Sequence, residues 1–150
     1  MKPISFTEVL ELGAPCEDVF LYMVDPKTAG TIDPSIVKWR SEDDPPKVGT
    51  LNHLTAKFLG VPIKMTSRFV ECQPPHRMVL QGVRPPMARW TVGTHDLQEI
   101  PGGMRYTYEI EMRSPIGFRL VHRVMARMMH RGVRMGCRRL LEVFGPARSL

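Results

Sequence analysis

The chain has 150 residues, of which 43% are hydrophobic and 24% charged, and its formal net charge is +6 at pH 7. A chain of this length can bury one sizeable core, and its composition excludes a disordered protein. No apolar run approaches the ~18 residues that a membrane span requires, and the N-terminus lacks a signal segment. We therefore expect one cytoplasmic domain that covers residues 1–150.

The first third of the chain predicts a strand followed by two short helices. Residues 4–12 are rich in β-branched and aromatic side chains, which is typical of a strand. Pro15 suits a helix start, and the acidic residues Glu17 and Asp18 favour a helix N-terminus. Asp25-Pro26 ends this helix, and residues 28–34 are predicted to form one or two further helical turns.

Six more strands are predicted before residue 114, because apolar runs alternate with strong turn signals such as Pro101-Gly102-Gly103. The clearest strand is 104–113, in which apolar and polar residues alternate strictly. The six predicted strands are residues 36–41, 49–58, 61–72, 77–83, 87–100 and 104–113.

Residues 116–144 are predicted to form one amphipathic helix, with Ser114 as its N-cap and Pro115 in its first turn. At ~1.5 Å per residue this helix would be ~43 Å long. At ~100° per residue, the arginines fall on one arc and most apolar residues fall opposite, together with Gly132 and Gly136. The arginines are Arg119, Arg123, Arg127, Arg131, Arg134 and Arg138. The apolar residues are Val121, Val124, Met125, Met128, Met129, Met135, Leu140 and Val143.

Consecutive strands joined by short turns form an antiparallel meander, and one face of such a sheet must be covered. The long helix is the sizeable cover that the chain offers. The predicted fold is therefore α+β: a curved antiparallel sheet of about seven strands around one long C-terminal helix, with two short helices after the first strand.

Five short motifs follow one another along the chain. They are Leu12-Gly13-Ala14-Pro15-Cys16-Glu17-Asp18-Val19-Phe20, Pro46-Lys47-Val48-Gly49-Thr50, Val70-Glu71-Cys72-Gln73-Pro74-Pro75-His76-Arg77, Gly102-Gly103-Met104-Arg105-Tyr106-Thr107 and Leu140-Leu141-Glu142. Together they resemble the helix-grip fold of the START-like (SRPBCC) superfamily, in its polyketide cyclase/dehydrase and lipid-transport branch. Met104 departs from that pattern, in which threonine is usual.

The resemblance implies a cavity between the concave sheet and the long helix. Members of this superfamily use that cavity for lipids, polyketides, hormones or aromatic metabolites. Some members cyclise or dehydrate polyketides, whereas many only bind or carry a ligand. The resemblance thus implies a fold and a ligand class and leaves the activity open.

Thirteen apolar or aromatic residues are predicted to line such a cavity. Seven are methionines, whose flexible and polarisable side chains suit an adaptable pocket. The alternative is that these residues simply pack against one another. Gly132 and Gly136 each cost ~1 kcal/mol of helix propensity relative to alanine, which favours close helix–sheet contact over space kept for a ligand. The predicted lining is Met65, Phe69, Met78, Leu80, Trp90, Val92, Tyr106, Tyr108, Met112, Met125, Met128, Met129 and Met135.

Catalytic residues are not identified, because the chain has no GxSxG, HExxH, GxGxxG or Walker motif. His53, Arg68 and His95 are candidate polar groups of the pocket, although a solvent-facing position is expected for each. Neither the five histidines nor the widely spaced Cys16, Cys72 and Cys137 show a metal-ligand spacing. No metal and no cofactor are therefore expected.

Two further polar features lie on the last strands. His95 and Asp96 are neighbours in a strand and must point to opposite faces, so they cannot act as a dyad. The hydroxyl groups of Tyr106 and Tyr108 could orient a ligand oxygen or act as weak acids. The alternative is that both are core tyrosines with hydrogen-bonded tips.

The basic excess lies at the C-terminal end, where residues 115–150 contain eight Arg and one Glu. The face formed by Arg119 to Arg138 is either a solvated helix surface or a site for anionic lipid headgroups, which attract basic residues by ~1 kcal/mol each. Nucleic acid is a weaker candidate, because no aromatic residues lie among these arginines.

These observations predict a protein that binds a hydrophobic or aromatic small molecule, lipid or polyketide-like, between the sheet and the helix. An alternative is an enzyme of the polyketide cyclase/dehydratase type. A second alternative is a basic module that uses the arginine face to bind a membrane or a nucleic acid. The oligomeric state is left open.

Overall fold

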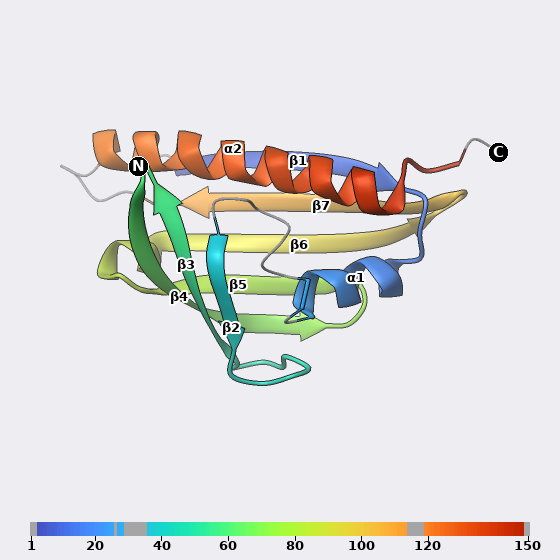
Figure 1. Ribbon diagram of the computed structural model, residues 1–150, viewed down its shortest axis with the longest axis horizontal. Coiled ribbons are helices and arrows are strands. Elements are labelled where there is room, and N and C mark those ends of the chain that lie inside the picture. Colours follow the sequence, from blue (N-terminus) through green and yellow to red (C-terminus); the bar gives the residue numbers. More distant parts are fainter. Residues whose placement is uncertain (1–2, 26, 29–35, 114–118, 149–150) are drawn as a thin grey trace.

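The computed structural model describes residues 3–25, 27–28, 36–113 and 119–148, and one sheet and one long helix make up most of it (Figure 1). The strands are β1 (Ile4–Leu12), β2 (Ile36–Ser41), β3 (Leu51–Phe58), β4 (Val61–Gln73), β5 (Arg77–Arg84), β6 (Thr91–Ile100) and β7 (Gly103–Met112). The helices are α1 (Cys16–Val24), the short 3₁₀ helix η2 (Pro86–Trp90) and α2 (Arg119–Phe144). Within these residues, no helix combines the length and the hydropathy needed to cross a bilayer.

The seven strands form one antiparallel sheet in the order β1-β7-β6-β5-β4-β3-β2. The segment from β2 to β7 is a meander, and β1 joins it at the β7 edge, where Ile4 lies opposite Met112. Figure 1 shows α2 lying along β1 and β7, whereas β2, β3 and the first part of β4 run across the direction of the helix. This arrangement confirms the predicted helix-grip fold.

Helix α1 follows β1 directly, and its acidic first turn contains Glu17 and Asp18, as predicted. Val19, Phe20 and Met23 are buried and pack with Leu97 of β6 in the main core. The second predicted short helix, residues 28–34, lies outside the described residues except for its first residue. The predicted cap of the long helix, at residues 114 and 115, lies outside them as well.

The strand predicted for residues 87–100 is shorter than expected, because residues 86–90 form η2 instead. Gly82 of β5 makes this possible, since a Cβ at that position would collide with the backbone carbonyl of Ala88. A glycine in β5 therefore lets η2 pack directly against the strand.

Helix α2 is turned about its axis relative to the face that the sequence predicts. At ~100° per residue, the buried face lies roughly a fifth of a turn from the centre of the predicted apolar face. Val121, Val124 and Met135 are consequently exposed rather than buried. Three of the five buried residues are alanine or glycine. The buried residues of α2 are His122, Ala126, Gly132, Gly136 and Leu140.

Candidate functional site: a cavity between sheet and helix

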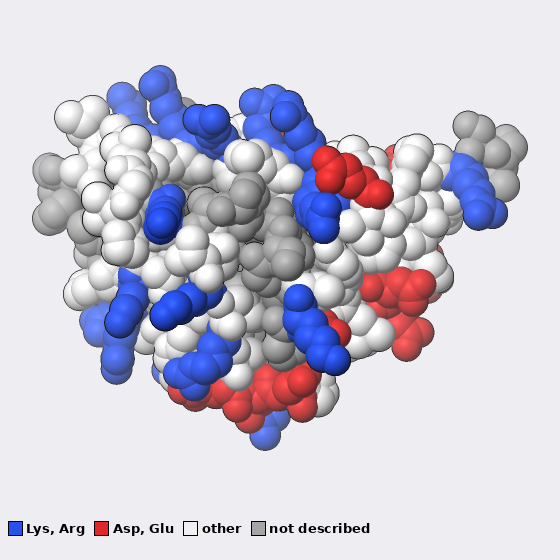
Figure 2. Space-filling view, in the orientation of Figure 1, with Lys and Arg blue, Asp and Glu red and all other residues white. Residues whose placement is uncertain are grey.

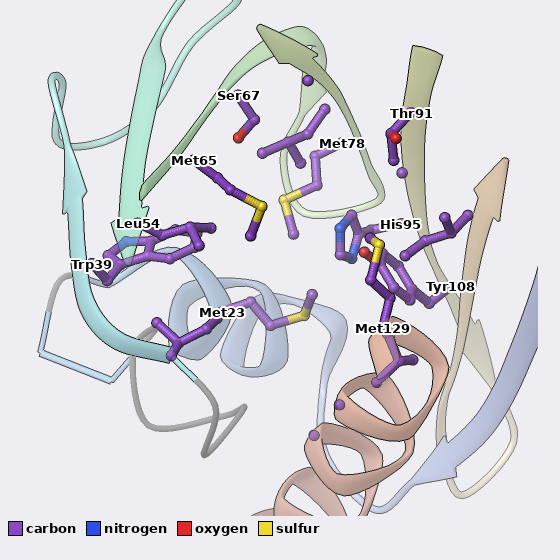
Figure 3. A pocket seen from close by; sticks show the side chains of 18 of the residues that line it. Met23, Trp39, Leu54, Met65, Ser67, Met78, Thr91, His95, Tyr108 and Met129 are labelled. Atoms are coloured by element: carbon purple, nitrogen blue, oxygen red, sulfur yellow. The ribbon is translucent and has the colours of Figure 1, made fainter. Parts of the chain in front are cut away.

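A partly enclosed cavity of about 290 Å³ lies between the concave face of the sheet and the two helices α1 and α2. Its walls are apolar for the most part, and Figure 3 shows the sulfur atoms of Met23, Met65 and Met78 near its centre. Small-molecule sites in proteins have volumes of ~300–1,000 Å³, so this cavity is at the small end of that range.

The structure brings eight of the thirteen predicted residues together around this cavity. The strands contribute six of the eight, among them Tyr106 and Tyr108 of β7, and α2 contributes the other two. The eight are Met65, Phe69, Met78, Leu80, Tyr106, Tyr108, Met125 and Met129. Gly132 and Gly136 are buried and also border the cavity.

The other five predicted residues do not border the cavity. Val92 points to the opposite face of β6, because η2 shifts the start of the strand and the inward positions become 91, 93, 95 and 97. Trp90 belongs to η2 and is 41% exposed. Met112 is buried beside Ile110 and Ala126 in a separate cluster under α2.

Met128 and Met135 complete this group, and the rotation of α2 explains their position. Both lie outside the cavity lining, and Met135 is 39% exposed. Their apolar character placed them on the predicted inner face, whereas the smaller Gly132 and Gly136 occupy that face in the structure.

Several cavity residues were not predicted, notably Met23, Trp39, Leu54 and Thr91. For Leu54, the two-residue turn Leu59-Gly60 was a signal in the sequence that could have predicted its position. It pairs Phe58 with Val61 and thereby places Leu54 opposite Met65, on the same face of the sheet.

His95 is the most informative polar residue of the cavity, and the expectation that it faces solvent is wrong. Its imidazole points into the cavity beside the ring of Tyr108, with the ring centroids 4.1 Å apart (Figure 3). Its Nδ1 lies 2.6 Å from the hydroxyl oxygen of Tyr106. The sequence-adjacent Asp96 points to the opposite face, as predicted, where it accepts a hydrogen bond from Arg77.

Burial keeps the ionisable groups of the cavity uncharged at neutral pH. It lowers the pKa of His95 to about 3 and raises the pKa of Tyr106 well above its ordinary value. Burial, with a smaller contribution from Glu8, raises the pKa of Cys137 to about 11. The imidazole, the phenol and the thiol are therefore all in their neutral forms.

The two other polar candidates lie away from the cavity, as expected. His53 is within hydrogen-bond distance of Glu42 and Thr66, at 2.9 and 3.1 Å, and does not border the cavity. Arg68 is exposed. Neither side chain can contact a ligand inside the cavity from these positions.

A separate group of possible metal ligands lies near the start of α1. The thiol of Cys16, an imidazole nitrogen of His76 and a carboxylate oxygen of Glu99 all lie within 4.8 Å of one another. Each comes from a different segment of the chain, so local spacing in the sequence could not reveal them. Cys16 is buried and the other two residues are exposed.

The outer face of α2 is basic and also exposes apolar side chains. Figure 2 shows lysine and arginine side chains gathered along the edge of the molecule where α2 lies. Glu8 of β1 contacts two residues of this face, since its carboxylate is 2.6 Å from His130 Nε2 and 3.7 Å from Arg134 Nε. Leu120, Val121 and Val124 are 77%, 46% and 50% exposed on the same helix.

The comparison with protein families identifies the kind of protein to which this fold and cavity belong. Residues 3–145 match the family described as polyketide cyclase/dehydrase and lipid transport. The chain belongs to this family. No functionally curated protein matches the sequence.

Solved structures of this family's fold superimpose on the chain at low sequence identity. The di-domain aromatase/cyclase StfQ from the steffimycin biosynthetic pathway has a TM-score of 0.77 at 14% identity, and the match covers 96% of this chain and 51% of StfQ. The chain therefore spans about half of that di-domain protein. Protein NE0264 from Nitrosomonas europaea has a TM-score of 0.70 at 18% identity, with 93% and 94% of the two chains covered. At these identities the matches show the fold.

Proposed function

We propose that residues 1–150 act as one ligand-binding domain, which holds a hydrophobic or aromatic small molecule in the cavity between the sheet and α2. The observation that carries this proposal is the cavity of about 290 Å³, whose walls are apolar and rich in methionine. Methionine side chains adapt to ligands of different shape, and burial of an apolar ligand contributes roughly 25 cal/mol per Å². The volume suits a compound of one or two rings or a short-chain amphiphile.

Binding without chemistry is favoured over a cyclase or dehydratase reaction. General acid–base catalysis works best with groups whose pKa lies near the working pH. The pKa of His95 is about 3 and the pKa of Tyr106 is raised well above its ordinary value, so neither exchanges protons readily at neutral pH. Both groups are better suited to holding a ligand than to moving its protons.

A cavity-filling substitution tests the proposal. Met129→Trp places a larger side chain at a cavity-lining position of α2, whereas Val124→Trp places the same side chain at an exposed position of the same helix. We expect Met129→Trp to weaken binding of the uncharged two-ring fluorescent probe prodan at least tenfold and Val124→Trp to leave it unchanged. Native mass spectrometry of the purified wild type should also detect a co-purified apolar compound. Equal probe affinity in the two variants would contradict the proposal.

The mixed surface of α2 favours a second candidate role, namely docking to an anionic membrane. Arginines attract anionic headgroups, and exposed aliphatic residues such as Leu120, Val121 and Val124 can enter the headgroup region. Nucleic acid would be expected to favour aromatic residues among the arginines, and none of the described residues of α2 before Phe144 is Phe, Tyr or Trp.

Vesicle sedimentation tests this second role. We expect the protein to sediment with vesicles of phosphatidylcholine and phosphatidylglycerol but not with phosphatidylcholine alone. Arg127→Glu combined with Arg131→Glu should abolish sedimentation, whereas the same charge change at the exposed sheet residues Arg40 and Arg68 should preserve most of it. Retention on duplex DNA in place of vesicles would contradict the membrane role.

A further inference from the structure

We infer that the polar end of the ligand is an uncharged oxygen group, a hydroxyl or a carbonyl, and that the pair His95 and Tyr106 binds it. This inference rests on the proposed function and narrows the ligand from an apolar compound to an amphipathic, electrically neutral one. His95 and Tyr106 form a polar part of a cavity wall that is otherwise mostly apolar.

The geometry fixes the imidazole of His95 and leaves one of its nitrogen atoms available. Nδ1 is within 2.6 Å of the Tyr106 hydroxyl, and the ring of Tyr108 lies against the imidazole at 4.1 Å between centroids. These two contacts hold the ring so that it points into the cavity (Figure 3). Among the described residues, no hydrogen bond engages the second nitrogen, Nε2.

The hydrogen-bond capacity of a neutral imidazole then determines which ligand group can bond to Nε2 of His95. A neutral histidine has one N–H donor and one nitrogen acceptor. If Tyr106 donates to Nδ1, Nε2 carries the proton and donates to a hydroxyl or carbonyl oxygen of the ligand. If Nδ1 donates to Tyr106 instead, Nε2 accepts from a ligand hydroxyl. A hydroxyl fits both tautomers and a carbonyl fits the first.

The remaining walls favour an uncharged group over a carboxylate or an amine. Among the described residues that line the cavity, none is Asp, Glu, Lys or Arg. A charged ligand group would lose its hydration there without gaining an ion-pair partner, which is unfavourable. The arginines of α2 do not compensate, because they are exposed on the outer side of the helix.

Trp39 lines another wall of the cavity. Its indole N–H is buried and has no hydrogen-bond partner within the described part of the chain. Figure 3 shows Trp39 on the opposite side of the cavity from His95. The Trp39 ring therefore adds flat apolar surface opposite His95, against which the ring part of an amphipathic ligand can pack.

Three ligands with the same ring system test the inference: 2-naphthol, 2-methylnaphthalene and 2-naphthoate. Their affinities are measured by fluorescence titration at pH 7 for the wild type and for His95→Phe. We expect naphthoate to bind at least tenfold more weakly than naphthol in the wild type. We also expect the preference for naphthol over methylnaphthalene to fall roughly three- to tenfold in His95→Phe, which is the effect of one neutral hydrogen bond.

Two further variants separate recognition from general damage to the cavity. Tyr106→Phe removes only the hydroxyl that fixes His95, so it should reduce the same preference while the melting temperature reports on folding. Leu54→Ala, on the opposite wall, should weaken naphthol and methylnaphthalene equally and leave their ratio unchanged. An unchanged ratio in both His95→Phe and Tyr106→Phe, or tighter binding of naphthoate than of naphthol, overturns the inference and leaves the proposed function intact. Binding of none of the three ligands overturns the proposed function, and the inference with it.

Discussion

The two faces of the sheet differ in charge even where their residues are neighbours in the sequence. On the inner face of β6, His95 lies against Tyr108 and is uncharged. On the outer face, Asp96 pairs with Arg77 at 2.8 Å, and Glu71 pairs with the same guanidinium at 3.0 Å. Adjacent residues of a strand point alternately to the apolar cavity and to water. Charged side chains therefore lie on the outer face of the sheet. The inner face is therefore uncharged along the cavity. This difference between the faces can be tested by adding a charge to each face and by removing one from the outer face.

A charge placed on the inner face should have the largest effect. Met78 is 3% exposed and lines the cavity, whereas Gln81 of the same strand is exposed. We expect Met78→Lys to lower the free energy of unfolding by about 3–5 kcal/mol, because the ammonium group is buried without an acidic partner. Gln81→Lys should change it by less than about 0.5 kcal/mol. Urea denaturation at pH 7 measures both values, and similar losses in the two variants would mean that the faces do not differ.

The pH dependence of stability should reveal the buried neutral histidine. An unfolded chain protonates histidine near pH 6.5, whereas the pKa of His95 in the folded protein is about 3. Between these values the unfolded state binds one more proton, so stability rises with pH and is lost as the pH falls from about 6.5 toward 3. The contribution of this group approaches ~1.4 kcal/mol per pH unit inside that window.

His95→Phe should remove this contribution. Urea denaturation of the wild type and the variant at pH 7, 6, 5 and 4 gives the comparison, and the carboxylates common to both proteins cancel. We expect the wild type to lose stability more steeply than the variant below pH 6. Parallel pH profiles would show that His95 is not held in an apolar environment.

The sequence predicts the fold well because its signals are local and repeated. The alternation of residues 104–113 and the Pro-Gly turns define strands and connections, and β1 and β2 have the predicted bounds. The cavity was predicted less completely, because its lining depends on which alternate residues of a strand, and which side of the helix, point inward. The 3₁₀ turn at residues 86–90 shifts β6 by one position, which moves His95 inward and Val92 outward. The rotation of α2 could not be predicted from apolar character either, since Gly132 and Gly136 are buried whereas Met128 and Met135 lie outside the cavity lining.

Removal of a charge from the outer face should have the smallest effect. Arg77 joins Glu71 and Asp96, but its side chain is 38% exposed and water screens both ion pairs. We expect Arg77→Met, which keeps much of the aliphatic stem, to lower the free energy of unfolding by no more than about 1 kcal/mol. The loss should shrink further in 1 M NaCl, because salt screens exposed charges. A double-mutant cycle with Asp96→Asn isolates the pairwise coupling, and a coupling of several kcal/mol that persists in high salt would place these charges in a low-dielectric environment. The contrast between the faces would then lie in the pairing of charges rather than in their exposure to water.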